Sequence, residues 1–475
     1  MEQTKEKVES PIKLNYKRVF LIGFAFFGIL LLWQVYDSWG QKFLSRLFME
    51  ALGTNDSEQV QYLVGMVLAL DNLAALIMLP IFGHFSDKTH TKIGKRMPFI
   101  LVGTFCCAVA FPFIPVFFHF HNLAGTISVM AIVVFFAMMY RNPAVALMPD
   151  ITPKPLRSKA NGIINIMGYV GGACATILAI LFNVDTYLNG GWSSGGGNIW
   201  LVETPFLIAS VLMVASALVL FFTIKENKIE KEMADQMRRG EEMAAIKDKI
   251  DDGKPMTKAN LTMLLLILVA EFFWFMADNG IGTFMFNYTE YYLLSDFSKA
   301  SINVIIGGLG SVLGFVAGGF LANKIGRKRT VFSGLGLTLV SLLVWFIISY
   351  CVPIVTPAEG STNPFPIYIY FVWAVKGFGM SLVHVNSFPM VIELCSNKKI
   401  GKFTGYYYAS SMAAQTITPC LLGLLLLNPN FSWQSLPLYA VSCVTVSIIV
   451  FVFVKNVKTN KTNIKKGLAA LDVDD

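Results

Sequence analysis

The sequence is dominated by long apolar runs separated by short polar turns. We count twelve such runs, at residues 18–49, 58–84, 97–118, 123–149, 160–183, 200–224, 259–290, 299–322, 330–351, 365–392, 402–427 and 435–455. An apolar helix of about 20 residues spans the hydrocarbon core of a bilayer, where only helices and closed barrels satisfy their backbone hydrogen bonds. The runs are too long for the strands of a barrel. The sequence therefore predicts an all-α membrane protein with twelve transmembrane helices.

The composition agrees with a bilayer protein and argues against several other classes. The chain is 55% hydrophobic and 14% charged, which leaves too little polar surface to enclose a water-soluble core of this size. The first run is too long for a cleavable signal peptide. The seven cysteines lie mostly inside apolar runs and lack metal-ligand spacing, so we expect neither a metal site nor a cofactor. The net charge of +8 does not indicate a nucleic-acid partner, because the basic residues cluster in particular loops.

The positions of Lys and Arg predict the orientation in the membrane. Basic residues gather before the first run and in the turns after the second, fourth, eighth and tenth runs. The alternate loops, around 119–122, 184–199, 352–364 and 428–434, contain neither Lys nor Arg. Positively charged loops remain in the cytoplasm. We therefore expect a multi-pass protein of the cell membrane with both termini in the cytoplasm.

A charged segment at residues 225–258 divides the apolar runs six and six. It is mixed in sign and rich in helix-forming residues, which predicts a partly helical cytoplasmic linker at the membrane surface. A regulatory or partner-binding helix is the alternative interpretation. The predicted organisation is a six-helix bundle at 1–224, the linker at 225–258, a second six-helix bundle at 259–455, and a cytoplasmic tail at 456–475.

The two halves of the chain repeat one another. Each contains a short basic turn that carries glycines, at 83–96 and at 319–329, and the first glycines of the two turns are 236 positions apart. Later in each half, Asp150 and Glu393 end the fourth and tenth runs, 243 positions apart, and a glycine follows each acid by twelve residues. The pattern indicates a tandem duplication with two parallel halves.

These turns resemble motifs of a known transporter family. The turn at 319–329, GFLANKIGRKR, resembles the cytoplasmic loop motif of the major facilitator superfamily. The segment 86–100, SDKTHTKIGKRMPFI, resembles the corresponding loop of sucrose/proton symporters and of glycoside–pentoside–hexuronide symporters, and ALMPD at 146–150 is similar to both groups. The resemblance implies the major facilitator fold, a monomer, and a secondary active transporter for a sugar or glycoside, such as a disaccharide, with alternating access.

The coupling site departs from that resemblance. Aligned through the loop motif, the sodium-binding carboxylates of the glycoside symporters fall on Ala75 and Leu79, and their fourth-span acid falls on Arg141. The fourth-span arginine of plant sucrose transporters would fall on Val145, one turn after Arg141. Because the sodium ligands are absent, we expect protons to be the coupling ion, with sodium as the alternative.

The basic turns and the acids near them are candidates for a cytoplasmic gate. Glycine permits close approach of two helices, and the cations can bridge to acids on the opposite bundle when the cytoplasmic side closes. The alternative is that these cations only fix the topology. The candidates are Gly83, Asp87, Lys88, Gly94, Arg96, Asp150, Arg157, Gly319, Asn323, Gly326, Arg327 and Glu393.

Polar side chains inside the apolar runs are candidates for the substrate and proton pathway, because a charge in a span is costly unless it faces water or a partner. The set is Trp33, Tyr36, Asp37, Asp71, Asn72, Arg141, Glu271, Asp278, Asn279, Lys376, His384 and Asn386. The resemblance implies that the first, fourth, seventh and tenth spans line a central cavity, and most of these residues belong to those spans.

The chemistry of each candidate suggests its role. A guanidinium at Arg141 can hold substrate hydroxyls in a fork, or pair with Asp37 or Asp71, and those two carboxylates are candidate proton carriers. An indole or phenol ring at Trp33 or Tyr36 can stack on the C–H face of a sugar, although helix packing is an equally ordinary role.

The second half contains its own set of candidates. His384 can carry a proton or serve as a hydrogen-bonding strut. Lys376 requires a counter-ion, for which Glu271 and Asp278 are the candidates. These two acids are seven residues apart and therefore share one helical face.

Other functions remain open from the sequence. The same fold could carry a nucleoside, a peptide or a drug. A membrane-embedded enzyme would need a catalytic cluster in its loops, whereas the outer loops hold few acids, so we expect no enzyme activity. A receptor would favour a large cytoplasmic tail, and the predicted tail is short.

Overall fold

The computed structural model describes residues 13–153, 156–250, 258–296, 298–358, 361–394 and 400–455. Within these ranges, twelve helical segments are long and apolar enough to cross a membrane, which confirms the predicted all-α class. The described part of the chain has no strand, and its one isolated β-bridge joins Ser295 to Asn363.

The first half forms six spans. Its helices are α1 (Tyr16–Leu52), α2 (Gln61–Lys88), α3 (Met97–Ala110), α4 (Phe113–His119), α5 (Leu123–Asp150), α6 (Arg157–Leu181), α7 (Val184–Asn189) and α8 (Trp200–Thr223), with 3-10 turns η1 (Ser57–Val60) and η3 (Trp192–Ser194). The predicted run 97–118 is divided between α3 and α4 near Pro112, since proline lacks the N–H that would continue the helix.

The second half also forms six spans. After α9 (Glu226–Ile250), its helices are α10 (Lys258–Asn287), α11 (Ser298–Ile325), α12 (Arg327–Cys351), α13 (Ile367–Glu393), α14 (Ile400–Leu426) and α15 (Leu436–Val452), with the π-helical turn η4 (Tyr288–Tyr292) and the 3-10 turn η6 (Trp433–Ser435). The predicted tail at 456–475 and the end of the predicted linker at 251–257 lie outside the described residues.

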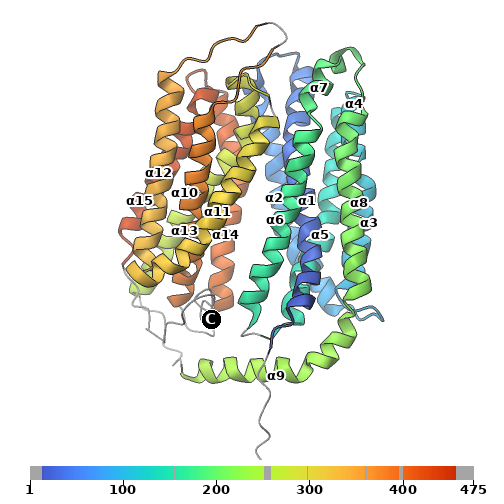
Figure 1. Cartoon of the computed structure of the whole chain (residues 1–475), viewed down its shortest axis with the longest axis vertical. Coiled ribbons are helices and arrows are strands. Elements are labelled where there is room, and N and C mark those ends of the chain that lie inside the picture. The colour runs from blue at the N-terminus through green and yellow to red at the C-terminus, as the bar shows by residue number, and fades with distance from the viewer. Residues whose placement is uncertain are drawn as a thin grey trace, which may run out of the picture.

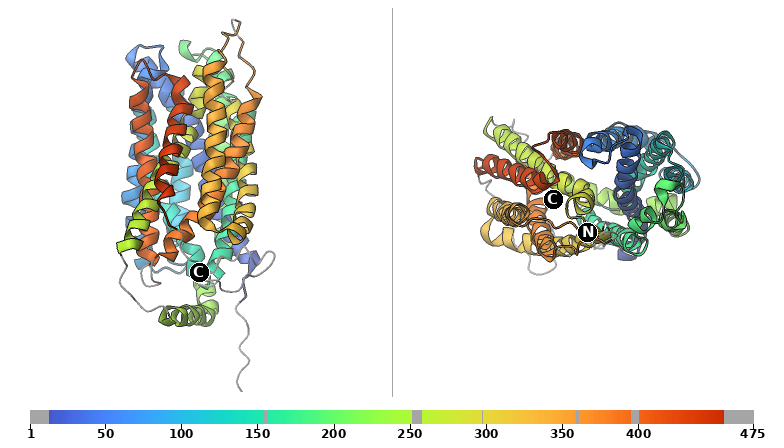
Figure 2. Two further views of the ribbon diagram at one scale, coloured as in Figure 1. Left: turned by 90° about the vertical axis from the view of Figure 1, so that its left-hand side faces the viewer. Right: turned by 90° about the horizontal axis from the view of Figure 1, so that it is seen from above.

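The spans form two bundles that stand side by side, with α9 lying across one end (Figure 1). Viewed from above, the first-half helices, blue to green, and the second-half helices, yellow to red, occupy separate groups (Figure 2). We call the end that carries α9 the linker end and the opposite end the distal end. The helices α6 and α11 diverge toward the linker end (Figure 1).

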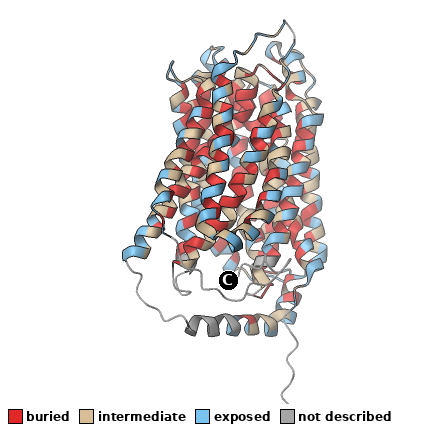
Figure 3. Cartoon of the chain, turned by 60° about the vertical axis from the view of Figure 1, so that its left-hand side comes forward, coloured by how far each residue is buried: buried red, intermediate tan, exposed pale blue. Residues whose placement is uncertain are grey.

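Buried residues face the inside of the bundles, and exposed residues lie on the outer faces (Figure 3). Many of the exposed residues are large and apolar. Phe105, Leu181 and Leu313 are each more than 60% exposed. Outward apolar side chains suit a protein surrounded by lipid, where the hydrophobic effect does not drive them inward.

Close helix contacts recur in the two halves. A Cβ added to Gly171 of α6 would collide with the backbone carbonyl of Phe27 in α1, and one added to Gly310 of α11 would collide with the carbonyl of Ala374 in α13. Small residues permit this backbone approach in membranes, where helices associate through packing and polar contacts.

Candidate substrate cavity

A cavity of about 660 Å³ lies between the two bundles. Its walls come from α1, α2, α5 and α6 on one side and from α10, α11, α13 and α14 on the other. A volume of this size falls within the range of small-molecule binding sites. Nine of the twelve predicted pathway residues line it: Trp33, Asp37, Asp71, Asn72, Arg141, Asp278, Asn279, Lys376 and His384.

The first-half wall combines a cation with two carboxylates. The guanidinium carbon of Arg141 lies 5.8 Å from the ring centroid of Trp33, a distance typical of a cation–π contact. Arg141 also interacts electrostatically with Asp37. The buried hydroxyl of Tyr36 donates a hydrogen bond of 2.6 Å to Asp71, so Tyr36 acts behind the cavity wall and orients that carboxylate.

The second-half wall holds an ion pair. The ammonium group of Lys376 lies 2.5 Å from a carboxylate oxygen of Asp278 and 5.9 Å from the ring centroid of Trp373. Asp278 is therefore the counter-ion of Lys376. His384 stacks on Phe275 with ring centroids 5.1 Å apart, and its Nε2 atom has no hydrogen-bond partner in the part of the chain that the structure describes.

Each bundle thus presents one cation beside an indole ring, Arg141 with Trp33 and Lys376 with Trp373. Such a surface combines flat apolar faces with charged hydrogen-bond donors and acceptors. It can bind a cargo that has both apolar faces and polar groups.

Three predicted pathway residues do not line the cavity. Tyr36 lies behind Asp71, as described above. Asn386 donates hydrogen bonds to the carbonyls of Leu382 and Gly318, at 3.0 and 3.4 Å, and so contributes to the packing of α13 against α11. Glu271 is fully buried outside the cavity.

The sequence analysis identified the cavity asparagines Asn72 and Asn279 but missed three glutamines of the cavity wall. Gln34, Gln41 and Gln415 line the cavity. The spacing of Gln34, Asp37 and Gln41 along α1 places all three on one helical face, and this periodicity was the available signal. Asn72 joins the two walls, since its side chain donates to the backbone carbonyl of Gln415 at 3.3 Å.

The predicted gate cations pair within their own bundle in this structure. Arg96 forms ion pairs with Asp87 and, at 2.8 Å, with Asp150. Arg327 pairs with Glu393 at 2.9 Å. In this conformation Arg96 and Arg327 each meet the acid that ends a neighbouring helix of their own half. The expected bridges to the opposite bundle belong to a conformation closed at the linker end, so they stay a prediction.

The remaining gate candidates have local roles or are open to solvent. Arg157 donates to the carbonyls of Pro149 and Thr152, at 2.8 and 3.1 Å, and so satisfies the end of α5. A Cβ added to Gly83 would collide with the amide of Asn142. Four candidates are exposed or have open space beside them: Lys88, Gly319, Asn323 and Gly326.

The start of α9 is hydrogen-bonded to the first basic turn, at residues 83–96. The carboxylate of Glu226 accepts hydrogen bonds from the backbone N–H groups of Lys95, Arg96 and Met97, at 3.0 to 3.2 Å. Gly94 adopts a φ of 122° beside this carboxylate. The contact supplies acceptors for the unsatisfied N–H groups at the start of α3. Burial raises the pKa of Glu226 above its ordinary value, and the N–H donors oppose that rise.

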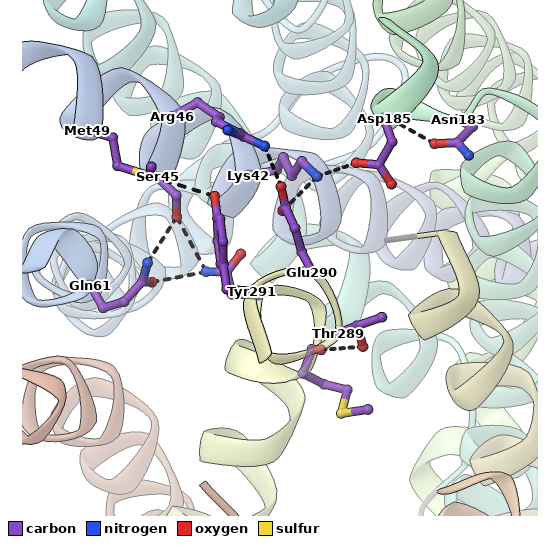
Figure 4. Close-up of polar contacts among 12 residues, drawn as sticks. Lys42, Ser45, Arg46, Met49, Gln61, Asn183, Asp185, Thr289, Glu290 and Tyr291 are labelled. Carbon is purple, nitrogen blue, oxygen red and sulfur yellow. Dashed lines mark hydrogen bonds and ion pairs between the residues drawn. The ribbon is translucent and has the colours of Figure 1, made fainter. Parts of the chain in front are cut away.

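A cluster of charges at the distal end joins the two bundles, and the sequence analysis did not identify it. The ammonium group of Lys42 on α1 pairs with Asp185 of α7 and, at 2.6 Å, with Glu290 of η4 (Figure 4). Arg46, one turn further along α1, donates to Glu290 at 2.6 Å. We call Lys42, Arg46, Asp185 and Glu290 the distal cluster. The available signal was a pair of cations near the outer end of the first span, where the positive-inside pattern predicts few.

Further contacts between the bundles also lie toward the distal end. The side chain of Asn287 donates to Gln61 at 3.0 Å, and the backbone N–H of Trp433 donates to Glu58 at 2.7 Å. With the distal cluster, these bonds hold the bundles together on the side away from α9. The conformation is therefore closed at its distal end.

Two six-helix bundles around one polar cavity define a multi-pass membrane transporter. The chain belongs to the major facilitator superfamily: the family model described as "Major Facilitator Superfamily" matches residues 43–358 and 280–472.

Individual relatives are more distant. An isoprimeverose transporter of Lactiplantibacillus pentosus is 25% identical over 293 residues, which cover 60% of this chain and 56% of that protein. Among solved structures, a D-xylose–proton symporter has a TM-score of 0.63 at 16% identity, covering 93% of this chain and 97% of the other. The nucleoside transporter NupG has a TM-score of 0.60 at 14% identity, covering 92% and 98%. At these identities, the structural likeness shows the shared fold alone.

Proposed function

We propose that this protein is a secondary active transporter that moves a sugar or glycoside, of about disaccharide size, together with protons. The observation that most supports this proposal is that Arg141 and Lys376 in the cavity wall each lie beside an indole ring. Indole faces bind the C–H faces of sugars, and charged donors bind their hydroxyl groups. The names of the isoprimeverose transporter and the D-xylose–proton symporter favour the same cargo class.

Proton coupling is supported by the balance of charge around the cavity. Lys376 and Asp278 neutralise one another on the second-half wall. On the first-half wall, two carboxylates, Asp37 and Asp71, face the single cation Arg141. One carboxylate is therefore in excess, and binding one proton would neutralise it. Arg141 also occupies the position at which the sodium-coupled relatives are expected to carry an acid.

The linker end is proposed to face the cytoplasm, because the basic turns lie there. The distally closed structure is then the inward-facing conformation. Rocking of the bundles would separate Glu290 from Lys42 and Arg46 and open the cavity to the outside. No covalent chemistry is required.

A nucleoside is the second candidate cargo, since aromatic side chains and amides also suit a nucleobase and NupG shares the fold. Counterflow in proteoliposomes separates the two classes. Vesicles preloaded with an unlabelled disaccharide should take up the labelled disaccharide, whereas exchange of nucleosides and not of any glycoside would overturn the sugar proposal.

A further inference from the structure

Glu271 is a buried acid that does not line the cavity. It lies in α10, seven residues toward the linker end from Asp278. Asp278 lines the cavity and pairs with Lys376. Glu271 has no solvent exposure and is not part of the cavity wall. Among the described residues, neither of its carboxyl oxygens has a hydrogen-bond partner.

The surroundings of Glu271 are formed by helices of its own bundle. On one side, Ser410 of α14 donates to the carbonyl of Leu268 at 2.8 Å. On another, Ser447 of α15 donates to the carbonyl of Ala270 at 2.9 Å. These bonds fix α10 against both neighbours, so the Glu271 side chain lies inside the bundle and not toward lipid.

The described titratable groups that face Glu271 offer it no positive charge. From α14, Tyr407 and Tyr408 interact with it electrostatically, and the Tyr407 hydroxyl already bonds to Ser387 at 2.8 Å. From α15, the nearby polar group is the Ser447 hydroxyl. From α13, His384 stacks on Phe275 and interacts with Asp278 and Lys376 instead.

An ionised carboxylate in such a place would carry the full cost of desolvation without a cation or a donor to offset it. The neutral acid avoids that cost, because it carries no net charge. The geometry therefore favours the protonated form of Glu271 in the distally closed conformation.

We propose that Glu271 is a proton-binding site, separate from the cavity, whose occupancy stabilises the distally closed conformation. A ligand that binds one of two conformations more tightly shifts the population toward it, and here the ligand is a proton. Loss of that proton favours any conformation in which the carboxylate meets water or a donor. The inference rests on the alternating access of the proposed transporter and not on the identity of its cargo.

Infrared spectroscopy tests the protonation directly. Protein that carries carboxyl-13C glutamate, in lipid at neutral pH, should show a carbonyl band from a protonated glutamic acid, because the isotope separates glutamate from aspartate. Glu271→Gln should remove that band, and the matched variant Asp278→Asn should retain it. Absence of a protonated-glutamate band in the wild type would overturn the proposal without the need for any variant.

The link to conformation is tested by a distance across the distal end. Two spin labels report that distance, one on Cys351, which is exposed at the end of α12, and one on L52C at the end of α1. The other cysteines are removed so that only these two sites are labelled. Raising the pH should move wild-type protein toward the longer distance, and Glu271→Gln should stay at the shorter distance throughout. A wild-type pH response in Glu271→Gln would contradict the proposal. Both tests omit sugar, so an error in the proposed cargo leaves their outcome unchanged.

Discussion

Arg46 donates a hydrogen bond of 2.6 Å to Glu290, and this pair joins α1 of the first bundle to η4 of the second. Lys42 lies 2.6 Å from the other carboxylate oxygen of Glu290. One acid therefore holds two cations of the opposite bundle, and the distal end cannot open until both pairs separate.

Removal of the charge at Glu290 should open the distal end. A hydrogen bond between charged groups contributes about 1.5–3 kcal/mol, so Glu290→Gln should raise the ratio of distally open to closed protein roughly tenfold or more. The distance between labels on L52C and Cys351 measures that ratio. The control is Glu50→Gln, whose acid pairs with His121 within the first bundle. An unchanged distance distribution in Glu290→Gln would show that the distal cluster does not hold the bundles together.

Removal of the charge at Asp185 should act in the opposite direction. Lys42 is held by Asp185 from its own bundle and by Glu290 from the other. Opening of the distal end separates Glu290 from Lys42, whereas Asp185 stays beside Lys42 because both belong to the first bundle. Asp185 therefore stabilises the Lys42 ammonium group in the open conformation. Asp185→Asn should therefore favour the closed conformation in the same distance measurement. A shift toward the open distance, as for Glu290→Gln, would contradict this division of roles.

Arg141 is the residue on which substrate binding depends most directly. Arg141→Ala should reduce counterflow of the cargo about 10- to 100-fold, the loss expected when a charged hydrogen-bonding group of a binding site is removed. Arg141→Lys should recover only part of the rate, because an ammonium group cannot form the planar fork of a guanidinium. Arg239→Ala on α9 controls for the loss of a positive charge elsewhere. Full transport by Arg141→Ala would remove this residue from the site.

Glu226 should stabilise the fold without taking part in binding. Glu226→Ala leaves the N–H groups of Lys95, Arg96 and Met97 without their carboxylate acceptor. We expect a loss of about 1–3 kcal/mol, seen as a lower thermal midpoint in detergent. Glu230→Ala, at an exposed position one turn later on α9, should leave the midpoint unchanged. Equal midpoints for the two variants would show that the anchor contributes nothing to stability.

The sequence predicted the spans and much of the cavity, because both follow from local patterns. A run of apolar residues identifies a membrane helix wherever it packs, and Asp37, Arg141 and Lys376 are conspicuous as charges inside such runs. The distal cluster was not predictable in this way. Lys42 and Glu290 are 248 positions apart, and only the packing of the two bundles brings them together.

Helical periodicity also has a limit that Glu271 and Asp278 illustrate. Their spacing correctly places both acids on one face of α10, but it does not tell where the cavity ends along that face. Asp278 reaches the cavity and Lys376, whereas Glu271, two turns nearer the linker end, is enclosed by its own bundle. The end of a cavity depends on the neighbouring helices, which no single span encodes.

Accumulation of a labelled disaccharide in proteoliposomes under an imposed pH gradient tests the central proposal most directly. With the outside acidic, the wild-type protein should concentrate the sugar inside, and a protonophore should abolish that accumulation. At least one of Asp37→Asn and Asp71→Asn should still exchange the sugar yet fail to concentrate it, because the excess carboxylate is gone. Accumulation driven by a sodium gradient and unaffected by pH, or uptake of no glycoside under any gradient, would contradict proton-coupled sugar transport.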